Sequence, residues 1–207
     1  MEEEQESTKK KIERYALKEF LDKGFNGASL RQIVKDAGVT TGAFYKYYPT
    51  KEALFEALVK PCADHIYEMY DRNYEKFSKQ DLAEQMNGMR ENAESRTDEL
   101  VTYLYAHHDV IKLLLTAAEG TEYADFVHNL AEREAKSALD FADLMRKNGL
   151  QVRELDEEFV HMMASGMFSA VFEIVLHDMD RKKSAVRISL LEEFYTAGWE
   201  KILGVKF

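Results

Sequence analysis

Residues 30–54 read LRQIVKDAGVTTGAFYKYYPTKEAL, and the spacing of apolar residues and glycine in this stretch decides the fold. Apolar residues first recur at the i, i+3, i+4 and i+7 positions of an amphipathic helix: Leu30, Ile33, Val34 and Ala37. Gly38 ends that helix at low conformational cost, and a third, short helix is predicted over residues 40–48. Two short helices joined by a tight turn have the local form of a helix-turn-helix.

The flanking sequence predicts one helix before these two and one after them. The first helix of the chain is capped by Ser7 or Thr8 and ends at Gly24, with Phe25 folding back onto it. Ser29 and Gln32 form a capping-box pair that opens the second helix. After Pro49, Thr50 caps a fourth helix, whose predicted apolar stripe is Leu54, Ala57, Leu58 and Pro61.

The third helix has an unusual free face. At 100° per residue, one side carries Thr40, Phe44, Tyr47 and Tyr48. The other side is small, aromatic and cationic, with Thr41 at its flank: Gly42, Ala43, Tyr45 and Lys46. Small residues permit close approach in a major groove, and apolar atoms meet thymine methyl groups. An ordinary solvated surface is the alternative interpretation of this face.

The charge distribution is asymmetric along the chain, whose net charge is −10. Residues 7–60 carry 11 basic and 6 acidic residues, or +5, whereas residues 61–207 carry 17 and 28, or −11. The acidic tip at Glu2, Glu3, Glu4 and Glu6 is expected to be disordered and to point away from any duplex. A mildly basic head on an acidic body is compatible with nucleic-acid binding by the head alone.

The stretch from Thr8 to Val59, and above all residues 30–54, resembles the DNA-binding domain of TetR/AcrR-family transcriptional regulators. The resemblance covers about a quarter of the chain. It implies an all-α fold, with a three-helix DNA-binding domain at residues 1–60 and a helical effector-binding and dimerisation domain at residues 61–207. It also implies a prokaryotic homodimer, usually a repressor, that binds double-stranded DNA at an inverted-repeat operator and releases it when a small molecule binds.

The same resemblance assigns roles within the helix-turn-helix, at about residues 31–50. Arg31 would reach a base or phosphate from the second helix, Tyr47 would contact the backbone, and Lys51 would bind phosphate. The complete set of expected DNA-binding residues is Arg31, Thr40, Thr41, Gly42, Ala43, Tyr45, Lys46, Tyr47 and Lys51.

Beyond Pro61, where the fourth helix is expected to kink or restart, helical periodicity predicts five further segments, for about nine helices in total: 82–106, 109–118, 122–147, 157–179 and 184–203. The last two are apolar on more than one side, which favours a four-helix contact across a two-fold axis. Two central core helices of a monomer are the alternative. The expected interface residues are Gly166, Ala170, Leu191, Phe194, Tyr195 and Gly198.

A small-molecule pocket is the least determined feature of the sequence. Methionine side chains repack readily, so an apolar or amphipathic effector is expected among methionine and aromatic residues. The candidate lining residues are Met86, Met89, Tyr103, Tyr105, Met145, Met163 and Met167. Each of these positions is compatible with an ordinary core residue as well.

Other classes of protein find little support. The chain carries no phosphate-binding glycine loop and no zinc-protease motif, so we expect neither an enzyme, a cofactor nor a metal. Cys62 is a lone cysteine, the start is acidic rather than basic, and the longest stretch without charged residues is 14 residues, 159–172. A cytoplasmic protein without a membrane span is expected. An all-α enzyme or a helical adaptor remains the rival class.

Overall fold

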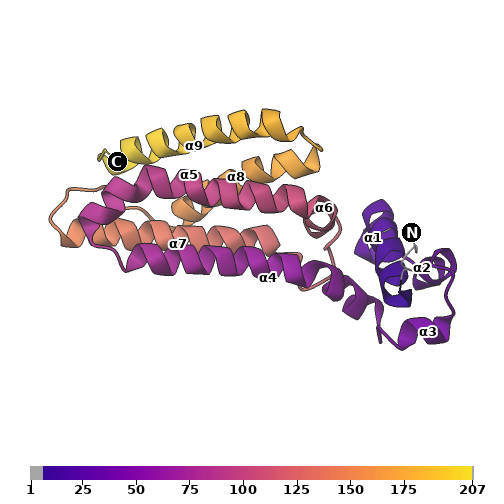
Figure 1. Cartoon of the computed structure of the whole chain (residues 1–207). Coiled ribbons are helices and arrows are strands. Elements are labelled where there is room, and N and C mark those ends of the chain that lie inside the picture. The colour runs from indigo at the N-terminus through magenta and orange to yellow at the C-terminus, as the bar shows by residue number, and fades with distance from the viewer. Residues whose placement is uncertain (1–6, 207) are drawn as a thin grey trace. The chain divides into compact units, whose positions relative to one another are not determined.

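The computed structural model describes residues 7–206, apart from the side chains of residues 89–97, and it is all-α over that range (Figure 1). The acidic tip falls outside the described residues. Nine helices cover the described chain, as predicted: α1 Thr8–Gly27, α2 Leu30–Asp36, α3 Thr41–Tyr45, α4 Lys51–Ser78, α5 Leu82–Ala106, α6 His108–Thr116, α7 Phe126–Lys147, α8 Glu157–Leu176 and α9 Arg181–Leu203.

The chain divides into two compact units whose boundary differs from the predicted one at residue 60. The first unit holds the chain up to Asp64 and also His107–Phe126, which includes α6. The Phe25 amide donates to the carbonyl oxygen of Ala117 at 3.0 Å, so the end of α1 is hydrogen-bonded to the end of α6. The two residues are 92 positions apart in the chain, and the periodicity of a single helix does not predict a contact over that separation.

Local capping follows the sequence in most details. Ser7 rather than Thr8 caps α1, and Gly24 interrupts that helix with a φ of 69°, after which a short helical turn continues to Gly27. Ser29 accepts from the Gln32 amide at 3.4 Å, but the predicted reciprocal bond is wrong. The Gln32 side chain instead donates to Asp36, and the Ser29 amide donates to Glu19 Oε1 at 3.1 Å.

The core of the first unit is aromatic. The rings of Phe20, Phe25 and Phe55 lie 5.2–6.0 Å apart, and all three side chains are buried. The predicted apolar stripe of α4 is therefore only partly right. Leu54 is buried, but Ala57 and Pro61 are exposed, because the helix turns Phe55 and Val59 inward. The buried side of the helix is thus displaced by about one residue from the predicted stripe, and the larger Phe55 ring occupies the core.

The second unit is a helical bundle built from α5, α7, α8, α9 and the later part of α4. The Tyr105 hydroxyl on α5 lies 2.7 Å from Ser184 Oγ on α9, and the Tyr70 ring on α4 packs against Phe168 on α8. The fourth helix was expected to kink or to restart at Pro61. A restart is wrong, because α4 continues through Pro61 as one helix.

Helix α8 is the most apolar element of this bundle. By length and composition alone it is able to cross a membrane, which the 14-residue uncharged stretch did not indicate. Its buried face, including Val160, Phe168 and Phe172, packs inside the bundle, and the core helix of a soluble protein has the same composition.

Candidate nucleic-acid interface

Helix α3 is fixed by a capping residue at its start and by two buried aromatic rings near its end. Thr40 caps the helix by accepting from the Ala43 amide at 3.1 Å. Phe44 and Tyr48 are 1% and 4% exposed and anchor the inner side. With its inner side filled by these rings, α3 presents its opposite side to solvent.

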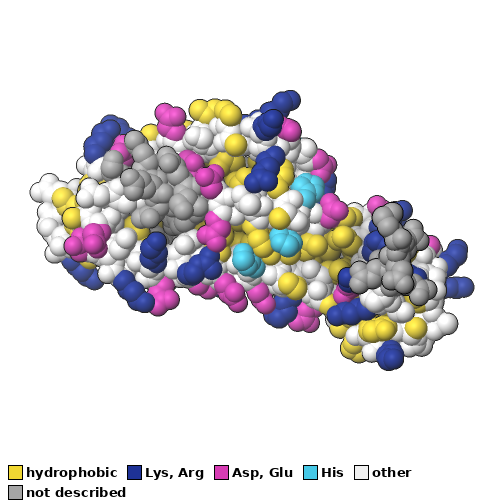
Figure 2. Space-filling view, in the orientation of Figure 1, with side chains coloured by type: hydrophobic (Ala, Val, Ile, Leu, Met, Phe, Trp, Pro, Cys, Tyr) yellow, Lys and Arg dark blue, Asp and Glu magenta, His cyan; other side chains and the backbone are white. Residues whose placement is uncertain are grey.

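The free side carries the predicted residues. Tyr45 is 54% exposed, and Thr41, Gly42 and Lys46 are exposed as well, with Ala43 half-buried. A Cβ at Gly42 would meet only the Thr40 hydroxyl, at 4.0 Å, so this position offers little steric bulk to an approaching surface. Figure 2 shows hydrophobic side chains at the surface around α3, with a cationic side chain beside them.

Tyr47 is placed differently from the helical-wheel prediction, which set it on the inner side. It is 39% exposed. Helix α3 ends at Tyr45, and the Tyr47 amide donates to the Phe44 carbonyl in a tight turn, so the 100° step no longer applies. An exposed Tyr47 is compatible with the backbone contact that the resemblance implies, and that contact remains a prediction. Arg31 is likewise exposed, on α2.

The Tyr48 hydroxyl forms a contact that sequence spacing missed. It donates to Glu13 Oε1 at 2.5 Å, over 35 residues of chain. Burial and this carboxylate both raise the pKa of the Tyr48 phenol, so the tyrosine stays a neutral donor at physiological pH. The bond ties the end of the α3 region to α1 and thereby restricts how α3 is presented.

The Lys51 side chain, which is expected to bind DNA phosphate, also contacts residues of its own chain. Its ammonium donates to the carbonyl oxygens of Phe25 at 2.7 Å and Ala28 at 3.3 Å, and lies 4.5 Å from the centre of the Phe25 ring. These carbonyls end α1, where the helix dipole favours a cation. Phosphate binding by Lys51 remains a prediction. What the structure adds is that Lys51 holds the start of α4 against the end of α1.

Glu19 supports the same corner from inside. Its side chain is largely buried and accepts from the Lys23 ammonium at 2.7 Å and from the Ser29 amide. The hydrogen bond from Lys23, followed by that from Ser29, lowers the pKa of Glu19 against the opposing effect of burial. The carboxylate thus fixes the entry of α2, from which Arg31 projects.

The predicted effector-pocket residues lie in several different packing environments, and their role in ligand binding remains a prediction. Met145 is fully buried in a hydrophobic cluster with Phe141 and Leu203, against which Met86 also packs. Tyr103 stacks on His65 at 4.1 Å, and the Tyr105 hydroxyl is bonded to Ser184 and Met179. Met163 and Met167 are half-buried on α8, and the side chain of Met89 lies outside the described residues. Met145 is therefore a core residue, and Met86 lies half-buried at the edge of the same cluster.

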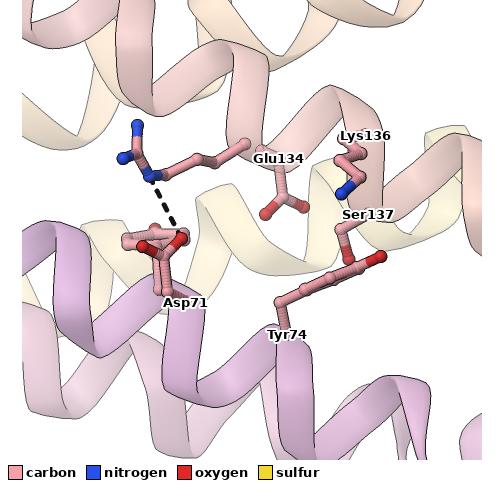
Figure 3. Close-up of a pocket in the computed structure, with 7 residues that line it drawn as sticks. Asp71, Tyr74, Glu134, Lys136 and Ser137 are labelled. Carbon is pink, nitrogen blue, oxygen red and sulfur yellow. Dashed lines mark hydrogen bonds and ion pairs between the residues drawn. The ribbon is translucent and has the colours of Figure 1, made fainter.

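Two cavities in the second unit have other linings. One, of about 230 Å³, lies between α4 and α7 and is polar, with Asp71, Arg133 and Lys136 among its walls (Figure 3). The other, of about 800 Å³, lies between α7 and α8 and includes Leu139 and Met162. Among the described residues, no group of three or more His, Cys, Asp or Glu is placed to hold a metal ion.

The predicted interface residues fall on a partly open face of α8 and α9. Gly166 and Phe194 are exposed, and Ala170, Leu191, Tyr195 and Gly198 are half-buried. Three apolar side chains that were not predicted are also more than half exposed on these helices: Met162, Val186 and Leu190. On α9, Val186, Leu190 and Phe194 follow one another at intervals of four residues, which the sequence shows. The sequence does not show which side of α9 faces solvent.

Comparison with known proteins gives a consistent result. Residues 14–58 match the family model of bacterial regulatory proteins of the tetR family. The HTH-type transcriptional regulator YuxN of Bacillus subtilis is 31% identical over 129 residues, which cover 61% of this chain and 40% of YuxN. YdgC of the same bacterium, also an HTH-type regulator, is 40% identical over 52 residues, or 25% of this chain and 27% of YdgC. The matches thus span less than half of these curated relatives.

Solved structures share the fold over nearly the whole chain. A TetR-like transcriptional regulator from Rhodococcus sp. RHA1 aligns with a TM-score of 0.58 at 18% identity, covering 92% of this chain and 96% of that one. A TetR-family member from Streptomyces coelicolor aligns with a TM-score of 0.57 at 19% identity, covering 93% and 90%. The relatives and the matched family are transcriptional regulators, not enzymes. Residues 14–58 thus match the DNA-binding domain of the tetR family of bacterial regulatory proteins, and the chain as a whole shares the fold of TetR-like transcriptional regulators.

Proposed function

We propose that this protein is a homodimeric DNA-binding repressor that leaves an inverted-repeat operator when a small molecule binds to its second unit. The observation that carries the proposal is the solvent-facing side of α3, where exposed Tyr45 and Lys46 accompany Gly42 and Ala43. This side combines apolar, cationic and small groups on a helix whose inner side is anchored by Phe44. A major groove accepts a helix of this kind and offers both base edges and phosphates to it.

The electrostatic balance supports binding by the first unit. Residues 7–60 carry a charge of +5 in a chain of −10 overall, so attraction to phosphate is local rather than global. The acidic body discourages non-specific contact with DNA through other surfaces. A regulator of this kind acts in the cytoplasm of a prokaryotic cell, where the chromosome lies.

Dimerisation is supported by the open apolar face of α8 and α9. Val186, Leu190 and Phe194 follow i, i+4, i+8 on α9 and are 63%, 60% and 69% exposed. Large apolar side chains gathered on one face of a soluble protein commonly mark an interaction surface. A second copy that presents the same face would cover them in an isologous, two-fold arrangement.

Footprinting on genomic fragments tests the dimer on DNA. A two-fold dimer with one α3 per subunit requires an inverted repeat, with half-site centres roughly 34–36 Å apart or slightly more. Protection of an inverted repeat is the expected result. Protection of a direct repeat would contradict the symmetric dimer, and no selective protection at low salt would contradict DNA binding and favour an adaptor.

Release by an effector is tested on the protein as it is purified. Small molecules that co-purify with the chain are identified by mass spectrometry and added back to the protein–operator complex. An effector of a repressor lowers operator affinity and raises expression of a reporter under that operator. A compound that binds the protein and leaves both readouts unchanged would contradict effector control by that compound.

A further inference from the structure

The free side of α3 carries no side chain of the kind that recognises adenine. Asn and Gln recognise adenine in the major groove, because a carboxamide accepts from the N6 amino group and donates to N7. The free side consists of Thr41, Gly42, Ala43, Tyr45 and Lys46, none of which is a carboxamide. The bases that α3 contacts must therefore be distinguished by another kind of group.

The carboxamide on the neighbouring helix α2 already has a partner. Residues 30–48 contain one carboxamide, Gln32, and one carboxylate, Asp36. The Gln32 Nε2 atom lies 2.8 and 2.9 Å from the two carboxylate oxygens of Asp36, to which it donates. Recognition of adenine by Gln32, or of the cytosine amino group by Asp36, would require this pair to separate.

The polar groups of α3 itself discriminate weakly between bases. The Thr40 hydroxyl accepts from the Ala43 amide and caps the helix. The Thr41 hydroxyl has no hydrogen bond among the described residues, but a hydroxyl both donates and accepts, so it pairs with any base edge. The Lys46 ammonium, also without a partner in the described part of the chain, donates to guanine or equally to a phosphate oxygen.

The Tyr45 ring is the large apolar group on this side, and its position is fixed before DNA binds. It is 54% exposed and packs edge to face against the buried Phe44 ring, with the ring centres 5.3 Å apart and the planes at 84°. Edge-to-face contact is a favourable arrangement of two aromatic rings. A ring that is already oriented loses less conformational freedom when it binds.

The space beside Tyr45 is open. Thr41 and Gly42 lie four and three residues before Tyr45 in α3, and this spacing places all three on one face of the helix. A Cβ at Gly42 would meet only the Thr40 hydroxyl, at 4.0 Å. A methyl group is therefore able to approach the backbone at Gly42 and contact the Tyr45 ring at about 3.5–4.0 Å, where dispersion attraction is strongest.

We propose that α3 recognises thymine: in each half-site, the 5-methyl group of one thymine lies against the Tyr45 ring, in the space that Gly42 leaves open, beside the Thr41 methyl group. Thymine is the base that presents a methyl group in the major groove. This inference rests on the proposed binding of α3 to DNA and names the bases that it distinguishes. Burial of the methyl group provides the discrimination without a directional hydrogen bond.

Deoxyuridine tests the contact with the wild-type protein. An operator is first selected from a random duplex library with the full chain, and each thymine of its half-sites is then replaced by deoxyuridine, which lacks only the 5-methyl group. At one thymine in each half-site we expect binding to weaken about fourfold, and about 15-fold when both half-sites are changed. Thymines outside the half-sites are the control and should be replaceable without effect.

Variants assign the methyl contact to a residue. Tyr45→Ala should bind the operator and its deoxyuridine form equally, because the partner of the methyl group is gone. Tyr45→Phe keeps the ring and should retain the fourfold difference. Lys46→Met is the matched control on the same side of α3: it should weaken binding to both duplexes and retain their ratio, because it removes a charge. Circular dichroism confirms that each variant is folded.

A second base analogue tests the exclusion of adenine. In 7-deazaadenine the N7 acceptor is replaced by carbon, so a carboxamide loses one of its two hydrogen bonds. We expect this replacement to leave operator binding unchanged, because Gln32 is bonded to Asp36. Weakened binding with 7-deazaadenine that disappears in Gln32→Ala, together with no effect of deoxyuridine, would overturn the proposal in favour of adenine recognition by α2.

The outcomes separate this inference from the proposed function. A chain that selects no sequence from the library overturns both. A selected operator that binds equally well with thymine and with deoxyuridine overturns thymine recognition and leaves the DNA-binding regulator intact. A fourfold difference that persists in Tyr45→Ala also overturns the inference, because another residue then contacts the methyl group.

Discussion

The Lys51 ammonium donates to the Phe25 carbonyl oxygen at 2.7 Å and lies 4.5 Å from the centre of the ring of the same residue. The first turn of α4 is thereby connected to the end of α1 by a charge-assisted hydrogen bond and a cation–π contact. The residue that the family resemblance assigns to phosphate binding is thus also an internal contact of the first unit. Both roles are open to measurement.

Lys51→Met keeps most of the apolar stem and removes the ammonium. We expect the free energy of unfolding to fall by about 1–2 kcal/mol, because the Phe25 and Ala28 carbonyls lose a charged donor. Chemical denaturation followed by circular dichroism measures the change. Lys60→Met is the matched control on the same helix, since its ion pair with Asp64 is about half-exposed and contributes little.

The same variant tests the phosphate role. The Lys51 ammonium has three N–H groups, and the two carbonyl contacts leave one for a phosphate oxygen. We expect Lys51→Met to weaken binding to all DNA sequences alike and to reduce the salt slope by roughly one per subunit. Weakened binding with an unchanged slope would show that Lys51 acts only inside the protein.

Tyr45→Ala tests whether the free side of α3 reads bases. Tyr45 is 54% exposed and projects from the free side of α3, so its loss should narrow the affinity gap between operator and random DNA by about 1–3 kcal/mol. The salt slope should stay nearly constant, because no charge is removed. Tyr45→Phe keeps the ring and should retain most of the gap. An intact gap in Tyr45→Ala would mean that this side is not the reading surface.

Glu19→Gln has a pH-dependent effect on stability. The folded-state pKa of Glu19 is lowered, so its contribution is present above the unfolded-state value of about 4.3 and is lost as pH falls through the folded-state value. At pH 7 we expect the variant to be about 1–3 kcal/mol less stable. The difference from wild type should shrink below about pH 4. Urea titrations at pH 7 and in this acidic range test both parts, and a constant difference would contradict the linkage.

Phe194→Glu tests the proposed dimer face. Phe194 is 69% exposed in the single chain, so a charge there should leave each subunit folded and yield monomers with weakened operator binding. Gly166→Arg is a less clean test, because a Cβ at Gly166 already lies 3.2 Å from the Tyr195 hydroxyl of the same chain. Gln151→Glu adds the same charge on an exposed loop and serves as control. An intact Phe194→Glu dimer in sedimentation would move the interface elsewhere.

The sequence by itself determined the helices and the identity of the candidate DNA-binding side. Capping residues such as Thr40 and chain-reversing glycines such as Gly38 act within one turn of helix, so their effect is legible from spacing alone. The free side of α3 followed from the same periodicity, except at Tyr47, where the helix had already ended. The 100° helical step predicts the side on which a residue lies only as far as the helix continues.

Only the tertiary structure decided which residues meet across the chain. The inward turn of Phe55 rather than Ala57, the bond from Tyr48 to Glu13 and the contact of Lys51 with Phe25 all depend on how helices pack, which no local spacing records. The same holds for the cavities, because Met145 became core and His161 came to line a groove through the pairing of α7 with α8. Burial is a property of the whole packed arrangement, whereas periodicity constrains only one helix at a time.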